Sequence, residues 1–133
     1  MSNLSANTQR VYEAGDTNNV PVKGSTEIWM GSAVGLAAGY ARMLASTDTF
    51  AGFADEHQNN TSATNGAKTI NVRTRGLIQL TISGIAVTDV GSDVYASDGN
   101  TFTLTVGSNV FIGKVHRFVT TDTCIVSFDV TNP

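Results

Sequence analysis

The sequence predicts a mostly-β fold, namely a small single-domain β-barrel or sandwich that follows an extended N-terminal arm. Two observations lead to this prediction. From about residue 70 to residue 130 apolar side chains recur at every second position, which is the period with which side chains alternate across a strand. The apolar runs are separated by turns rich in Gly, Asp, Asn and Ser. A chain of 133 residues has room for one such domain.

Residues 1–24 are polar and turn-prone, and neither a helical nor a strand period runs through them. We expect this stretch to be a flexible arm that becomes ordered on a neighbouring subunit, with residues 25–133 forming the β-barrel domain. A frayed terminus is the alternative interpretation. The anchors of the arm at a subunit interface would be its isolated apolar residues, Leu4, Val11, Tyr12, Val20 and Val22.

Residues 28–45 contain three glycines spaced four apart, Gly31, Gly35 and Gly39. In a membrane this spacing is typical of a helix-packing face. However, Arg42 lies within the run and much of the run is Gly, Ala and Ser, which argues against a membrane span. We therefore predict two strands, at about 27–34 and 39–45, joined at residues 35–38, and no contact with a membrane.

The next stretch holds a predicted exposed loop and a predicted long strand. Residues 55–67 are rich in Asn, Ser and Thr and are expected to serve as a contact loop. From Ile70 to Ile82 apolar residues keep one parity for thirteen positions, which exceeds the usual strand length. We expect a bend or bulge near Gly76, so that one strand serves two sides of the domain.

Two hairpins complete the prediction. The first turns at Asp98–Gly99, and its second arm should point three side chains inward, namely Phe102, Leu104 and Val106. The second joins residues 111–119 to 124–130 through a four-residue loop, so that Val119 faces Cys124 and Val115 faces Phe128.

No arrangement of reactive side chains predicts catalysis. Cys124 should point into the core, while His116 lies on the opposite parity of its strand, so the two cannot form a nucleophilic dyad. The adjacent residues Asp55, Glu56 and His57 should spread apart rather than converge on a metal. Because no phosphate-binding loop is present either, we expect a protein that is not an enzyme and has no cofactor or metal.

The charge pattern limits the possible partners. A net charge of −3 with scattered basic residues argues against a nucleic-acid binder that works by neutralising phosphates. Only 14% of residues are charged, and uncharged polar groups cost less to bury against a partner than ions do. The composition therefore suits a surface that is covered in use. A polar N-terminus and a lone cysteine suggest synthesis in a reducing cytosol.

The C-terminal half resembles a known family in its order of turns and strands. The motifs that carry the resemblance are Gly91-Ser92-Asp93-Val94-Tyr95-Ala96-Ser97-Asp98, Phe102-Thr103-Leu104, Ile112-Gly113-Lys114-Val115 and Ile125-Val126-Ser127-Phe128. This layout is similar to small head decoration, or cement, proteins of tailed bacteriophages, and the similarity covers about residues 26–130.

The resemblance implies a structural virion protein, made in the host cytoplasm, that binds the major capsid protein on the outer capsid surface. It would bridge capsomers and stabilise the expanded shell as a homo-oligomer, with a trimer favoured and a dimer possible. The alternative is a carbohydrate- or receptor-binding β-module of a phage surface structure. That class should cluster exposed aromatic residues on loops, and we do not expect Trp29 and Tyr40 to lie so. An enzyme would need Asp55, His57 and His116 to converge.

Overall fold

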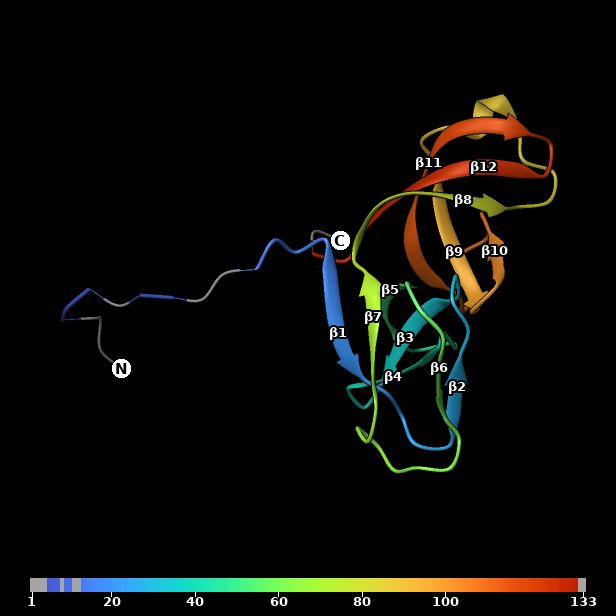
Figure 1. Ribbon diagram of the computed structural model, residues 1–133. Coiled ribbons are helices and arrows are strands. Elements are labelled where there is room, and N and C mark those ends of the chain that lie inside the picture. The colour runs from blue at the N-terminus through green and yellow to red at the C-terminus, as the bar shows by residue number, and fades with distance from the viewer. Residues whose placement is uncertain (1–4, 8, 11–12, 132–133) are drawn as a thin grey trace.

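The computed structural model describes residues 5–7, 9–10 and 13–131. These residues form twelve strands and one short 3-10 turn, arranged as two five-stranded antiparallel sheets and a two-stranded ribbon (Figure 1). Within this part of the chain no sheet closes on itself as a barrel. The predicted mostly-β class is therefore confirmed, and the architecture is the sandwich rather than the barrel.

The first sheet has the strand order β1-β7-β5-β3-β4. Its strands are β1 (Thr17–Pro21), β3 (Ala33–Ala37), β4 (Tyr40–Met43), β5 (Thr49–Ala54) and β7 (Thr69–Arg73). The ribbon packs against this sheet and consists of β2 (Thr26–Ile28) and β6 (Gln58–Asn60). Together they enclose the smaller of two apolar clusters, made of Val20, Val22, Ile28, Val34, Ala41, Ala51, Ala54, Ile70 and Val72.

The second sheet has the order β10-β9-β11-β12-β8 and curves around the larger cluster (Figure 1). Its strands are β8 (Arg75–Thr81), β9 (Asp93–Asp98), β10 (Thr101–Thr103), β11 (Val110–Thr120) and β12 (Thr123–Asp129), and the 3-10 turn η1 (Val87–Asp89) precedes β9. The aromatic centre of the cluster joins both sheets, because Phe53 of β5 packs edge-on against Phe128 of β12 at 4.9 Å between ring centroids.

One continuous stretch of chain links the two sheets. β7 ends at Arg73, β8 begins at Arg75, and the buried Thr74 stands between them. The prediction that this strand serves both sides is thus confirmed, with the break at Thr74, two residues before the expected bend. The Thr74 amide donates to the Asp16 carbonyl (2.9 Å), and the Val130 amide donates to the Thr74 carbonyl (2.8 Å). The start of β1 and the end of β12 therefore meet at this crossing.

The predicted boundary of the arm at residue 24 is wrong. β1 begins at Thr17 and pairs with β7, with Val20 opposite Ile70. Val20 is 6% exposed and Val22 is fully buried, both within the smaller cluster. The two residues are core residues of the first sheet, so they are not available as anchors for a partner. We use the term N-terminal segment for residues 1–16, which precede the first strand.

The predicted strands at 27–34 and 39–45 are shifted in the structure. The hairpin is formed by β3 and β4, which pair Ala37 with Tyr40 across Ala38 and Gly39. Both turn residues have positive φ, 51° and 89°, as a two-residue type I′ turn requires. The loop expected at 35–38 is therefore a tight turn at 38–39.

The terminal hairpin also differs from its predicted register. β11 ends at Thr120 and β12 begins at Thr123, so the turn between them has two residues instead of the predicted four. Two bulges on β11 then shift the pairing, so that Val115 lies opposite Val126 and Phe118 lies opposite Cys124. Each bulge adds one unmatched residue, and alternation alone does not reveal such an insertion.

Candidate interaction surface

The N-terminal segment leaves the sandwich at the crossing between the sheets. All its described residues before Gly15, namely 5–7, 9–10 and 13–14, are exposed, and Figure 1 shows them extending away from the sheets. Of the predicted anchors, Leu4, Val11 and Tyr12 lie outside the described residues.

The base of the N-terminal segment is held by several bonds to the crossing. Arg75 places Nε 2.7 Å from Oδ1 of Asp16, and its Nη2 donates to the carbonyl of Ala14 at 3.2 Å. The Thr74 hydroxyl donates to the carbonyl of Gly15. Because these bonds add to the backbone bond between Thr74 and Asp16, the segment starts from a fixed point on the sandwich.

A second exposed surface lies at the end of β2. Ile28, the last residue of β2, is buried, and Trp29, which follows the strand, is 55% exposed. The indole stacks on the imidazole of His57, with 4.3 Å between centroids and 17° between planes. His57 Nε2 lies 2.6 Å from Oε2 of Glu27. Trp29 is thus exposed, whereas Tyr40 of β4 is half-buried, so the two do not form the cluster of exposed aromatic residues that a carbohydrate-binding module should have.

A third surface is an apolar groove of about 490 Å³ between the sheets. Phe50 of β5 and Phe128 of β12 line it together with Phe111 of β11. Phe111 is 39% exposed and packs edge-on against Tyr95 at 5.9 Å. Lys114 also lines the groove and is paired with Asp93 at 2.5 Å. The groove thus offers apolar contact area beside an exposed ion pair.

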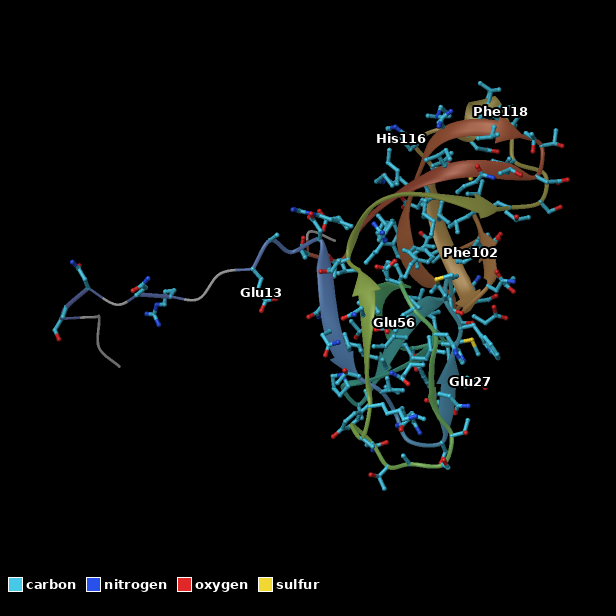
Figure 2. All side chains as sticks on the ribbon, in the orientation of Figure 1. Glu13, Glu27, Glu56, Phe102, His116 and Phe118 are labelled. Carbon is cyan, nitrogen blue, oxygen red and sulfur yellow. The ribbon has the colours of Figure 1, made fainter. Side chains whose placement is uncertain are left out.

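Cys124 and His116 lie on different sides of the second sheet. Cys124 is fully buried in the larger cluster, and burial raises the pKa of its thiol. His116 is exposed at a bulge of β11, on the outer surface seen in Figure 2. A thiol with a raised pKa inside an apolar core is a poor nucleophile, so Cys124 serves the packing of the sheet.

The three adjacent polar residues at 55–57 engage three different partners. Asp55 pairs with Arg73 at 3.0 Å, Glu56 accepts the amide of Asn71 at 2.8 Å, and His57 binds Glu27. In the part of the chain that the structure describes, no group of His, Cys, Asp or Glu side chains could hold a metal ion. The divergence predicted for these residues is thus observed.

The expected contact loop at 55–67 is partly built into the fold. Asn60 of β6 is 1% exposed, and its amide group donates to the carbonyls of Val22, Lys23 and Thr64 at 3.0–3.2 Å. These bonds fold residues 60–67 back against the end of β1. The sequence gives no signal for this role, because a buried asparagine and a loop asparagine look alike before the long-range pairing is known.

Comparison with known proteins adds no relative. No family model matches the chain, no curated protein matches it, and no solved structure matches its fold. Among the described residues, no helix has the length and apolar character to cross a membrane.

Proposed function

We propose that the protein is a capsid decoration protein. It binds the major capsid protein on the outer surface of a tailed-phage head and stabilises the expanded shell by bridging capsomers. The observation that supports this function best is an N-terminal segment whose described residues before Gly15 are all exposed and whose base is fixed on the sandwich, since such a segment reaches a neighbouring subunit while the sandwich stays in place. The family resemblance of the C-terminal half points to the same role.

The composition supports a contact role as well. With 14% charged residues, the surface can be covered by a partner at a lower desolvation cost than a typical charged surface. Single contacts made by a small domain are weak. A homo-oligomer, with a trimer favoured over a dimer, places several copies on the shell at once, and linked contacts multiply the affinity without any new bond.

Co-sedimentation with capsids tests the proposal. The purified protein is mixed with expanded, undecorated capsids and, separately, with unexpanded procapsids of the same phage. We expect saturable binding to the expanded form alone, because the bridged sites exist only in the expanded lattice. Absence of binding to the cognate expanded capsid contradicts the proposal.

A second function, a carbohydrate- or receptor-binding module, is favoured by Trp29. An exposed indole is a platform on which a sugar ring can stack, and Trp29 is 55% exposed. The test is a glycan-binding screen of the wild type and of Trp29→Ala, with Phe111→Ala as a control at another partly exposed aromatic residue. Binding that Trp29→Ala alone removes supports this function. A screen without any bound glycan leaves the capsid role as the better proposal.

A further inference from the structure

A smaller groove of about 350 Å³ runs beside the first half of β8. Its apolar floor contains Phe53, Ile78 and Phe128, and three charged residues, Asp55, Arg73 and Arg75, also line the groove. Two of the most exposed apolar side chains of the described residues stand on its rims, Met30 at 69% and Leu77 at 60% exposed. Apolar side chains that line a depression and remain in water mark a surface that a partner covers.

One wall of this groove is the edge of a sheet. β8 is the last strand of the second sheet, and among the described strands it pairs only with β12. Its other edge faces the groove with backbone N–H and C=O groups that form no sheet bonds. Natural edge strands are commonly protected by Lys, Pro or bulges. The seven residues of β8 contain one charge, Arg75, whose guanidinium is engaged by Ala14 and Asp16.

An unpaired strand edge beside an apolar floor is the arrangement that binds an extended peptide by strand addition, in which the backbone supplies affinity and alternate side chains enter the pocket. We propose that this groove takes the N-terminal segment of a second copy of the chain, with residues 5–14 lying along β8. The inference deepens the proposed function, because it names the neighbouring subunit that the segment reaches.

The position and length of the N-terminal segment support this occupant. Arg75 lines the groove and also binds Ala14 and Asp16, so the base of the segment lies close to the groove but across the crossing strand from it. Ten extended residues span about 33 Å, whereas seven residues of a strand span about 23 Å. Residues 5–14 are therefore long enough to cover the part of β8 that lines the groove, Arg75–Ile78.

The strand geometry shows why the occupant comes from another copy. The N–H and C=O of Thr74 bind Asp16 and Val130, and the two groups of one strand residue point to the same edge. The segment therefore starts on the β12 side of the crossing strand. The groove lies on the other side, where β5 pairs with β7. A segment would have to cross its own strand to enter its own groove, but a facing copy presents its segment directly.

Mutual exchange then gives a closed assembly. Each copy donates one segment and receives one, so that all grooves are filled in a symmetric dimer or in a ring of three. Nothing on the capsid is needed for this association, so the protein should self-associate in solution by itself.

The test is the self-association of the full chain, followed by sedimentation velocity over a range of protein concentrations. Leu77→Lys places a charge on the groove rim at a residue outside the core, and Val106→Lys is the matched control, because Val106 is equally exposed at 58%. We expect a concentration-dependent oligomer for the wild type and for Val106→Lys. Leu77→Lys should associate at least about tenfold more weakly, since an apolar contact is lost and a charge is buried.

A synthetic peptide of residues 1–14 provides the second measurement. Added in excess, it should compete for the groove, dissociate the wild-type oligomer and change the fluorescence of Trp29, the only tryptophan of the chain and the neighbour of Met30. Should Leu77→Lys fail to fold, as judged by circular dichroism, Met30→Lys on the other rim replaces it.

A monomeric wild type overturns the inference, and so does an oligomer that neither Leu77→Lys nor the peptide weakens. Because these experiments contain no capsid, their outcome is separate from that of the proposed function. If the protein is a monomer but still binds expanded capsids, the segment exchange is ruled out and the decoration role stands. If it forms the exchanged oligomer but does not bind capsids, the decoration role is ruled out and the segment exchange stands.

Discussion

At the scale of single residues, Phe128 is the side chain on which the packing of the two sheets depends most directly. It is 6% exposed and its ring meets Phe53 at 4.9 Å and Phe50 at 6.4 Å. We expect Phe128→Ala to lower the free energy of unfolding by on the order of 3–5 kcal/mol, because it leaves a cavity between the sheets. Urea unfolding measures this change. The control Val106→Ala should stay within about 0.5 kcal/mol of the wild type, and a similar small loss for Phe128→Ala would contradict the packing described above.

A partly buried ion pair at the edge of the first sheet predicts a dependence of stability on pH. Arg42 of β4 donates two hydrogen bonds to Asp48, at 2.9 and 2.7 Å, and the Ala45 amide adds a third. The bonds from Arg42, opposed by burial, hold the pKa of the Asp48 carboxyl below its usual value. A lowered pKa contributes stability that is present above the ordinary pKa of about 4 and is lost as the pH falls through the folded value.

The variant Asp48→Asn tests this pair. At neutral pH it should lower the free energy of unfolding by about 1–3 kcal/mol, since the Arg42 guanidinium loses its ionised acceptor. Between pH 6 and pH 3 the wild type should lose more stability than the variant, so the two curves from urea unfolding converge. Parallel curves would show that Asp48 does not titrate with a shifted pKa.

Which side chains point inward could be predicted for most but not all positions. Cys124 and Phe128 are buried as their alternation indicates, whereas Val106, predicted inward, is 58% exposed. Val106 follows the end of β10 at Thr103, so the strand period no longer applies to it. Phe118 packs against the core in place of Val119, because the bulges of β11 reverse the parity between them. Alternation predicts burial only where a strand is continuous.

At the scale of elements, the boundary between the N-terminal segment and β1 predicts the outcome of two truncations. Deleting residues 1–13 leaves the bonds of Ala14–Asp16 to the crossing, and the described residues that it removes are all exposed, so the melting temperature should change by only a few degrees. Deleting residues 1–22 removes β1 together with Val20 and Val22, which are buried in the smaller cluster. The loss of two buried valines and a paired strand should destabilise the domain by several kcal/mol. Equal melting temperatures would show that β1 does not belong to the fold.

The close approaches between strands that depend on glycines could not be predicted from the sequence. A Cβ on Gly52 would lie 2.1 Å from the carbonyl oxygen of Arg73, and one on Gly35 would lie 2.5 Å from the Asp48 carboxylate. Gly52 therefore permits the close approach of β5 to the end of β7, and Gly35 leaves room for the ion pair of Asp48. Both were visible as glycines, but only the strand pairing shows what each one avoids. The same holds for Asn60, whose acceptors come from distant residues.

At the scale of the whole molecule, the chain is organised around its crossing strand. The alternation from Ile70 to Ile82 predicts this strand and its bend, because thirteen alternating residues exceed the usual length of a strand. Only the structure shows that both ends of the domain meet at this strand, because Asp16 and Val130 both bind Thr74. The N-terminal segment, the end of β12 and the groove beside β8 are thus close together. One region of the surface carries the parts that the proposed assembly would use.

This arrangement gives a prediction that joins the two proposals. If exchange of the N-terminal segments builds the oligomer, and the oligomer binds the capsid through several copies, then Leu77→Lys should weaken capsid attachment although Leu77 need not contact the capsid. Linked contacts commonly raise affinity by about 10²–10⁴, so at low protein concentration the variant should bind expanded capsids at least about a hundredfold more weakly than the wild type. Val106→Lys should bind as the wild type does.

The concentration dependence of this effect identifies its cause. If only the linkage is lost, binding by Leu77→Lys returns to that of the wild type once the protein concentration is high enough for the variant to form the oligomer. If a direct capsid contact is lost, the variant binds more weakly than the wild type also in that range. Binding of fluorescently labelled protein to capsids, measured over several decades of concentration, separates the two cases. Equal binding curves for Leu77→Lys and Val106→Lys would mean that the groove beside β8 has no part in attachment.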